Sequence, residues 1–270
     1  MDIIDIVFVY HLRDDRQIAW HGRKHMHDSH MYELHYFISG VGSFLNGSTT
    51  WNITPGSLHI TSPGILHQII ATEDRKPITY YAVLFDAFED GELQTLLERF
   101  KTSHAPFEMG TSHRFFFANL LEKHFSKKQD LILAARHNFL AFLYDLSAGL
   151  SAYGPLENAH VEKALAIMQN SIEKNLTLTE LCSRLQLSHE HFVRVFSERI
   201  GMPPMRYYTQ LKMEAARAML SSTNLRIQEI ADKLGFSNQF NFTRTFKRYT
   251  QQSPSIFRSQ CLQRADFSHL

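Results

Sequence analysis

The chain has 270 residues, which is enough for two domains with ordinary hydrophobic cores, and 44% of them are hydrophobic. It carries 28 Lys and Arg against 27 Asp and Glu, a formal net charge of +1, so the overall charge indicates no particular partner. The first residues are acidic and no apolar run reaches about 18 residues, so we expect neither a signal peptide nor a membrane span. Two distant cysteines exclude a disulfide framework. A cytoplasmic protein with no membrane partner is expected.

The charges are unevenly distributed along the chain. Residues 155–270 contain 15 Lys and Arg against 10 Asp and Glu, whereas the first 154 residues contain 13 against 17. A surface that binds phosphate groups is therefore expected in the C-terminal part.

Short strands are predicted for residues 1–85. The segments IIDIVFVYHL, MYELHYFISG, GSFLNGSTTWNI, SLHITS, HQIIA and PITYYAVLFD are rich in β-branched and aromatic residues. Turn-forming pairs separate several of them: Asn46-Gly47, Pro55-Gly56, Pro63-Gly64 and Lys76-Pro77. Many short strands with evenly spaced turns predict a sandwich or a small barrel.

Five histidines lie between residues 21 and 35. Imidazole nitrogens together with one carboxylate suit zinc, iron, nickel or copper. Glu33 and His35 should point to the same face of their strand, because side chains alternate along a strand. The alternative is that these histidines form a polar rim or an exposed loop.

Residues 91–150 change to helical periodicity. The segments GELQTLLERFKTSH, SHRFFFANLLEKHFSK and DLILAARHNFLAFLYDLSAGL have apolar residues three and four positions apart. Their apolar faces are broad enough to pack twice, either within the chain or across an isologous dimer interface. Gly154 and Pro155 then interrupt the helical pattern, which places a short linker near 152–155.

Residues 176–201 predict two helices joined by a tight turn. Leu178, Leu181, Cys182 and Leu185 form an apolar stripe on the first helix, which Thr177 or Thr179 can cap. Ser188 can cap the second helix, whose inward residues are Phe192, Val195 and Phe196 and whose outward residues are His189, Glu190, Val193, Arg194 and Arg199.

The same pattern returns in residues 225–258, about 49–50 residues later. Gly235 suits a left-handed residue that ends the first helix, and Ser237 or Asn238 can cap the second. Residues 203–220 predict one long helix between the two units. The outward residues of the last helix have no balancing acid and suit base edges and phosphates: Gln239, Asn241, Arg244, Lys247 and Arg248.

The run IQEIADKLGFSNQFNFTRTFKRYTQQSPSIFR resembles the C-terminal signature of AraC/XylS-type transcription regulators, with its IA–GF–F–R–FK–SP–R framework. The segments GMPPMRYY and LKMEAARAML match the same family. The resemblance is close over about residues 159–260 and looser in the N-terminal half. Gln251 stands where the family usually has Gly, so a less permissive residue must make that turn. Cys182 stands where the family prefers Ala.

The resemblance implies base contacts at His189, Glu190, Val193 and Arg194 in the first unit and at Gln239, Phe240, Asn241 and Arg244 in the second. Arg can bond guanine, Glu can accept from cytosine, and Gln or Asn can read adenine. Lys247 and Arg248 are expected on phosphates, which fix register without reading sequence.

The N-terminal half is similar to the cupin barrel that many AraC-type regulators carry as a sensing domain. The cupin metal pattern, a His-x-His, a Glu and a later His, falls on His25, His27, Glu33 and His67, with His30 as a substitute because the spacing before Glu33 is long. A divalent transition metal is therefore the candidate cofactor. Strand alternation and family position give the candidate effector-binding residues Glu33, His35, Phe37, His59 and His67.

These observations predict an α+β multidomain protein, with an N-terminal cupin-like β-barrel followed by helices and a C-terminal all-α domain with two helix-turn-helix units. The expected bounds are 1–152 for sensing and dimerisation, with the barrel about 1–88 and helices about 91–150, and 156–262 for DNA binding. The predicted function is a sequence-specific, effector-responsive transcription activator that binds double-stranded DNA as a homodimer, with RNA polymerase as a second partner. It is not expected to be an enzyme. The alternatives are a metal-dependent cupin enzyme with a helical appendix, or a constitutive DNA-binding protein whose barrel only dimerises.

Overall fold

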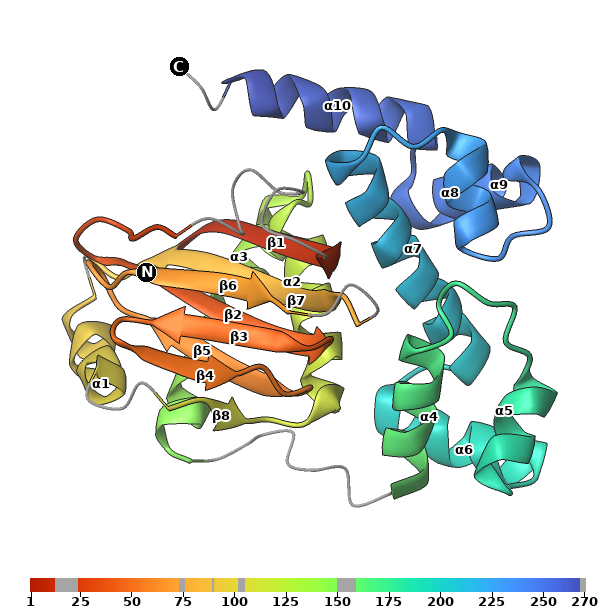
Figure 1. Cartoon of the computed structure of the whole chain (residues 1–270), viewed down its shortest axis with the longest axis horizontal. Coiled ribbons are helices and arrows are strands. Elements are labelled where there is room, and N and C mark those ends of the chain that lie inside the picture. Colours follow the sequence, from red (N-terminus) through yellow and green to blue (C-terminus); the bar gives the residue numbers. More distant parts are fainter. Residues whose placement is uncertain (13–23, 73–75, 89, 102–104, 150–158, 268–270) are drawn as a thin grey trace. The chain divides into compact units, whose positions relative to one another are not determined.

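The computed structural model describes residues 1–12, 24–72, 76–88, 90–101, 105–149 and 159–267. The chain divides into two compact units, Met1–Glu157 and Asn158–Leu270. Strands and helices build the first unit, and the described part of the second contains helices alone (Figure 1). No helix among the described residues is long and apolar enough to cross a membrane. The linker predicted near 152–155 lies outside the described residues.

Two antiparallel sheets form the first unit. Their strands are β1 Asp2–Leu12, β2 Met31–Ser39, β3 Gly42–Asn46, β4 Thr49–Asn52, β5 Ser57–Thr61, β6 His67–Ala71, β7 Ile78–Asp86 and β8 Phe107–Glu108. One sheet has the order β1-β7-β2-β5-β8 and the other the order β4-β3-β6. Strands β1 to β7 fall in the segments that the sequence predicts. Strand β8 was missed because two residues are too few to give an alternating pattern.

The space between the two sheets holds a core rich in aromatic rings. Phe37 of β2 and Tyr80 of β7 are register partners whose ring centroids lie 5.6 Å apart. Phe44 of β3 meets Phe37 from the other sheet at 5.7 Å, and all three side chains are buried. Because side chains alternate along a strand, Glu33 and His35 of β2 point to the same interior.

Two helices, α2 Arg114–His124 and α3 Gln129–Ser147, cover the opposite face of the larger sheet. The 3-10 turn η1 Thr111–His113 precedes α2, and α1 Gly91–Lys101 contacts α3. Tyr36 of β2 stacks on Phe117 of α2 at 4.8 Å, and Phe85 of β7 meets Phe139 of α3 at 5.1 Å. Strand β2 is thus buried on both faces along most of its length, including its polar residues Glu33 and His35.

The second unit consists of two helix pairs joined by one long helix (Figure 1). Helix α7 Pro204–Ser222 connects the pair α5 Leu178–Leu185 and α6 His189–Ile200 to the pair α8 Ile227–Lys233 and α9 Gln239–Thr250. Helix α4 Ala159–Gln169 precedes the first pair, and α10 Pro254–Phe267 follows the second. The predicted duplication and the single connecting helix are both present.

The first pair has the predicted caps. Thr177, and not Thr179, caps α5: its hydroxyl accepts from the backbone N–H of Glu180 at 3.2 Å, while its own N–H donates to the Glu180 carboxylate at 2.9 Å. This reciprocal pair is a capping box. The Ser188 hydroxyl accepts from the N–H of His191 at 3.3 Å at the start of α6.

The second pair ends and restarts as the sequence predicts. Gly235 follows α8 with φ 67°, and a Cβ there would lie 2.9 Å from the carbonyl carbon of Lys174, so glycine is required on two grounds. Asn238, and not Ser237, caps α9, since its side-chain oxygen accepts from the N–H of Asn241 at 2.9 Å.

A buried lysine joins the two pairs. The Lys212 ammonium on α7 donates to the carbonyl of Lys174, before α5, at 2.6 Å and to the carbonyl of Leu234, after α8, at 2.7 Å. It lies over the rings of Tyr208, at 4.9 Å, and Phe236, at 5.5 Å. One side chain thereby holds a segment of each helix pair against the connecting helix.

The residues that end α6 and α9 occupy equivalent positions, so exchanging their types in both directions tests the strain of the left-handed backbone. Gly201 ends α6 with φ 79° and Gln251 ends α9 with φ 63°, and a Cβ at Gly201 would have no atom within 4 Å. We expect Gln251→Gly to raise the free energy of unfolding by about 0.5–1 kcal/mol and Gly201→Gln to lower it by a similar amount, because a left-handed backbone disfavours a side chain. Urea denaturation monitored by circular dichroism checks both changes; effects of the same sign would contradict this account.

Lys212 predicts a pH dependence of stability. Burial lowers the pKa of Lys212 from 10.5 to about 8. Between pH 8 and 10 the unfolded chain then holds a proton that the folded chain has released, so the free energy of unfolding should rise with pH. A neutral amine can still donate to both carbonyls. Relative to Lys212→Met, the wild-type protein should therefore gain stability across this window, as measured by denaturation at stepped pH.

The control for this measurement is Lys233→Met, because Lys233 lies exposed on α8. This variant should follow the wild-type pH profile. A Lys212→Met profile parallel to that of the wild type would show that Lys212 does not titrate in this window.

Candidate functional site

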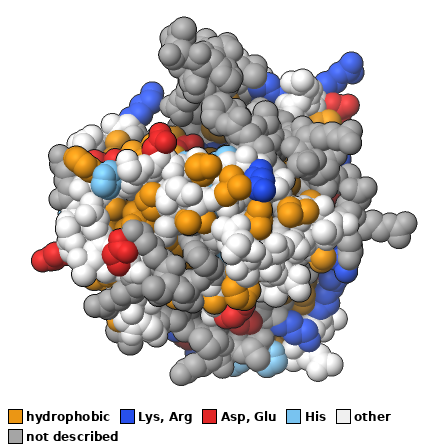
Figure 2. Space-filling model, turned by 60° about the vertical axis from the view of Figure 1, so that its left-hand side comes forward, with side chains coloured by type: hydrophobic (Ala, Val, Ile, Leu, Met, Phe, Trp, Pro, Cys, Tyr) orange, Lys and Arg blue, Asp and Glu red, His pale blue; other side chains and the backbone are white. Residues whose placement is uncertain are grey.

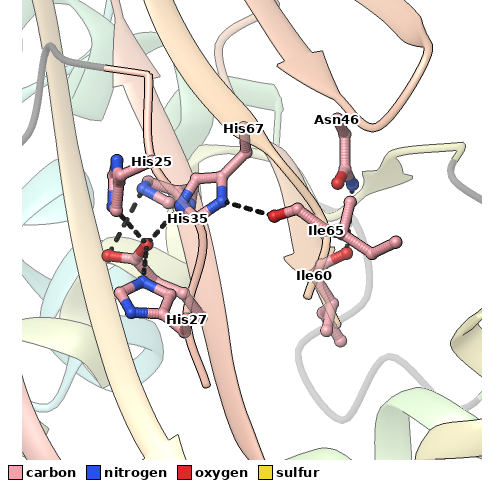
Figure 3. A network of polar contacts seen from close by, with 8 residues as sticks. His25, His27, His35, Asn46, Ile60, Ile65 and His67 are labelled. Carbon is pink, nitrogen blue, oxygen red and sulfur yellow. Dashed lines mark hydrogen bonds and ion pairs between the residues drawn. The ribbon is translucent and has the colours of Figure 1, made fainter. Parts of the chain in front are cut away.

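Four imidazoles surround one carboxylate, that of Glu33, in the first unit (Figure 3), and Nε2 of His35 lies 3.6 Å from its Oε1 atom. The Oε2 atom of Glu33 lies 2.7 Å from Nε2 of His67, 3.0 Å from Nε2 of His27 and 3.6 Å from Nε2 of His25. One potential ligand atom from Glu33 and one from each of these last three histidines lie within 4.8 Å of one another. The sequence pattern proposed these same four residues, and the fold brings them together.

Two of the four side chains come from the sheets and two from a short segment before β2. Glu33 lies on β2 of the larger sheet and His67 on β6 of the smaller one, whereas His25 and His27 belong to residues 24–30, which we call the strap. The backbone of His25 exchanges two hydrogen bonds with that of His67, at 3.1 and 2.9 Å, and the carbonyl of His27 accepts from Gly64 at 2.9 Å. The backbone therefore fixes the strap before any ligand is considered.

The hydrogen bonds of His67 leave room for a proton or a metal ion between its ring and Glu33. Its Nδ1 lies 3.2 Å from the carbonyl oxygen of Ile65, a contact that requires an N–H on Nδ1 (Figure 3). In the neutral ring Nε2 then carries a lone pair, and this lone pair points at a carboxylate oxygen of Glu33 2.7 Å away. Two lone pairs are stable at that distance only with a proton or metal ion between them. A backbone carbonyl behind the ring is also the usual orientation of a metal-bound histidine.

The charge of Glu33 fits the same interpretation. Burial alone raises the pKa of a carboxyl group, but the neighbouring His35 and hydrogen bonds with His25, His27 and His67 hold the pKa of Glu33 well below its ordinary value. The carboxylate is therefore ionised although it is buried. Three imidazoles and one carboxylate are a donor set for zinc, iron, nickel or copper.

His30 does not join the cluster. It has φ 76°, and its ring packs against Phe88 with centroids 4.7 Å apart. The left-handed backbone at His30 turns the chain from the strap into β2, and its side chain is directed at this neighbour. The geometry therefore does not support the expectation that His30 substitutes as a metal ligand.

The five candidate effector-binding residues are all buried in the interior between the sheets. His35 and His59 are register partners on β2 and β5, and Phe37 meets the ring of His59 at 5.7 Å. Among the described residues neither ring nitrogen of His59 has a hydrogen-bond partner, and burial lowers its pKa to about 4, so this imidazole is neutral.

Further interior groups were not among the candidates. The hydroxyls of Thr61 and Tyr80 are buried without a recorded hydrogen-bond partner, and Phe44 lies 4.7 Å from His59. Strand alternation could have found Thr61, because it lies two positions after the candidate His59 on β5. The pairing of β2 with β5 and β7, which places Thr61 opposite Glu33, is not readable from one sequence. Buried polar groups without partners are characteristic of places where a ligand or water completes the hydrogen bonding.

On α6 the predicted contact residues lie on the surface. His189, Glu190 and Arg194 are exposed and Val193 is half-buried, whereas Phe192 is in the core. The Arg194 guanidinium pairs with Glu198 one turn further on, at 3.1 Å.

On α9 all six predicted residues are exposed: Gln239, Phe240, Asn241, Arg244, Lys247 and Arg248. Phe240 is 83% exposed, which is unusual for an aromatic side chain and leaves its ring available to a partner. Phe242 and Phe246 fill the core beneath this face.

Comparison with known families agrees with this geometry. The family described as "AraC-like ligand binding domain" matches residues 9–165, and the family described as "Helix-turn-helix domain" matches residues 181–260.

Known relatives cover both units. An uncharacterized HTH-type transcriptional regulator, YfiF of Bacillus subtilis, is 27% identical over 87% of this chain and 78% of its own length. The Msm operon regulatory protein of Streptococcus mutans is 22% identical over 85% of this chain and 84% of its own. The raffinose operon regulatory protein RafR of Pediococcus pentosaceus is 33% identical, but over 35% of this chain and 34% of its own length.

Among solved structures, the C-terminal domain of AraT, a response regulator from Geobacillus stearothermophilus, is 28% identical, covers 39% of this chain and 88% of its own, and gives a TM-score of 0.38. The match of the ligand-binding family alone spans more than half of the chain. The chain therefore belongs to the AraC family, and it is a DNA-binding transcription regulator with a cupin-like ligand-binding domain followed by a helix-turn-helix domain.

Proposed function

We propose that this regulator inserts α6 and α9 into two successive segments of the DNA major groove, and that a ligand in the first unit controls this binding. The observation that carries the proposal is the exposed, largely polar face of each helix above a matched pair of buried phenylalanines. Such faces suit base edges and phosphates, and a second helix in a helix-turn-helix is the one that enters the groove.

Control by the first unit is supported by the chemistry of its interior. The cluster of His25, His27, Glu33 and His67 can hold a divalent transition metal, and the neighbouring groups His59, Thr61 and Tyr80 can bond a small polar molecule. A ligand that binds one conformation of the regulator more tightly than another shifts the population that binds DNA. We propose activation, through RNA polymerase, as the outcome.

A homodimer is also part of the proposal. On α3, Leu133 and Tyr144 are exposed although Phe139 and Leu143 of the same helix are buried against the first unit. The side of the chain shown in Figure 2 has small groups of hydrophobic side chains separated by polar ones. An apolar face left on a helix suits an isologous contact with a second copy.

DNA binding can be tested without knowing the natural operator. A duplex is first selected by the wild-type protein from a random-sequence library, and dissociation constants and footprints are then measured on it. Arg194→Ala and Arg244→Ala should each weaken binding by about 1–3 kcal/mol and remove protection from one of two adjacent major-groove segments.

The matched control is Lys163→Ala, since Lys163 lies exposed on α4 of the same unit but on neither recognition helix. It should leave the footprint intact. Binding of both Arg variants at wild-type strength, or failure of the wild-type protein to select any sequence, would refute the proposed mode of binding.

The metal site has an equally direct test. Equilibrium dialysis against Zn²⁺ or Ni²⁺, followed by elemental analysis, should give about one ion per chain with a higher melting temperature. His67→Ala should lose the ion, because His67 links Glu33 to the smaller sheet, whereas His30→Ala should retain it. Equal loss in both variants, or no ion in the wild-type protein, would exclude this cluster as a metal centre.

The same dialysed samples separate sensing from the enzymatic alternative. A metal-dependent change in the dissociation constant for the selected duplex supports sensing. Metal binding with substrate turnover and no change in DNA binding would favour a cupin enzyme with a helical appendix.

A further inference from the structure

The two recognition helices have the same framework. Both α6 and α9 have twelve residues, and a shift of 50 positions superimposes their buried pairs, Phe192 and Phe196 on Phe242 and Phe246. Each begins at a side-chain cap and ends at a left-handed residue. Since the cores and ends correspond, functional differences between the helices must come from their outward residues.

Their outward charges differ sharply. Helix α6 carries two acids and two bases, Glu190, Arg194, Glu198 and Arg199, which cancel. Helix α9 carries no acid and three bases, Arg244, Lys247 and Arg248. The affinity of a protein for DNA phosphates depends on such uncompensated cations. The electrostatic contribution to DNA binding should therefore come mainly from α9.

One matched position concentrates this difference. The repeated arginines Arg194 and Arg244 correspond under the shift of 50, and the residue one turn later is Glu198 in α6 but Arg248 in α9. Both carboxylate oxygens of Glu198 lie close to one guanidinium nitrogen of Arg194, at 3.1 and 3.2 Å. For Arg244 the described part of the structure records no such carboxylate.

The ion pair is weak enough to be exchanged on DNA. Arg194 and Glu198 are 60% and 62% exposed, and an exposed pair of this kind contributes roughly 0–1 kcal/mol. A base edge that accepts two hydrogen bonds from Arg194 compensates for losing this pair, whereas on a mismatched sequence the pair can stay closed. Glu198 therefore keeps the Arg194 cation from phosphates, and its own carboxylate repels phosphates on any sequence.

We propose that the two helices divide the work of recognition: α9 anchors the protein on the phosphate backbone, and α6 discriminates between sequences. Glu198 supports this division, because it cancels the charge of Arg194 and so keeps the attraction of α6 for phosphates low. This inference rests on the proposed binding of both helices in the major groove.

The test compares Glu198→Gln with the wild-type protein on two duplexes, the selected one and a scrambled one of equal length and composition. The substitution should strengthen binding to both duplexes, by up to about fivefold, because it removes a repulsive charge and the cost of opening a surface ion pair. Asp232→Asn is the control, because Asp232 is an exposed acid on α8, outside both recognition helices, and should leave binding to both duplexes unchanged.

The complementary variant is Arg248→Gln. It should weaken binding to both duplexes alike and reduce the dependence of log Kd on log salt concentration by about one phosphate contact. Unchanged or weaker binding to both duplexes in Glu198→Gln would overturn the neutralising role of Glu198. A loss in Arg194→Ala that is no larger on the selected duplex than on the scrambled one would overturn the sequence-reading role of α6. A change of selectivity in Arg248→Gln would overturn the division of work. Failure of the wild-type protein to select a sequence would instead refute the proposed binding mode itself.

Discussion

A charge removed from water must be matched by partners, and each half of this molecule is organised around one such charge. In the first unit the buried carboxylate of Glu33 is surrounded by imidazoles from the strap and from the opposite sheet. In the second, the buried ammonium of Lys212 is held by carbonyls that precede α5 and follow α8. In both cases the partners lie far apart in the chain. Satisfying the charge therefore fixes how distant segments pack together.

The two buried charges have different consequences. Lys212 is satisfied by backbone carbonyls and two aromatic rings, so it stabilises a fixed arrangement of the two helix pairs. Glu33 is satisfied by side chains whose ring nitrogens can also bind a metal ion, and unpartnered polar groups such as those of His59 and Tyr80 lie in the same interior. Within the described residues, the first unit thus has a cluster of metal-binding groups and buried polar atoms in one interior, whereas the charge of Lys212 is fully used within the helical unit. This contrast matches a sensing domain joined to a DNA-binding domain.

The duplication gives the helical unit two recognition helices, α6 and α9, with the same framework. Different residues on their outward faces make the two helices different. The inward phenylalanines cannot change without loss of the core, because each fills a buried position. The outward positions are free of this constraint, and there the helices carry opposite charges at equivalent sites, Glu198 and Arg248. Stability and recognition are therefore encoded on opposite sides of the same helices.

The sequence by itself determined the helix pairs and the strands β1 to β7, because these depend on periodicity and on neighbours a few residues away. It left two candidates for each of two caps, and the local backbone of the structure selected Thr177 and Asn238. It also indicated the metal cluster, although through a spacing pattern that admitted His30 as well. Only the tertiary contacts excluded His30 from the cluster and paired Thr61 with Glu33 in the larger sheet. Strand pairing and the direction of each side chain depend on contacts between residues far apart in the chain, and one sequence does not record those contacts.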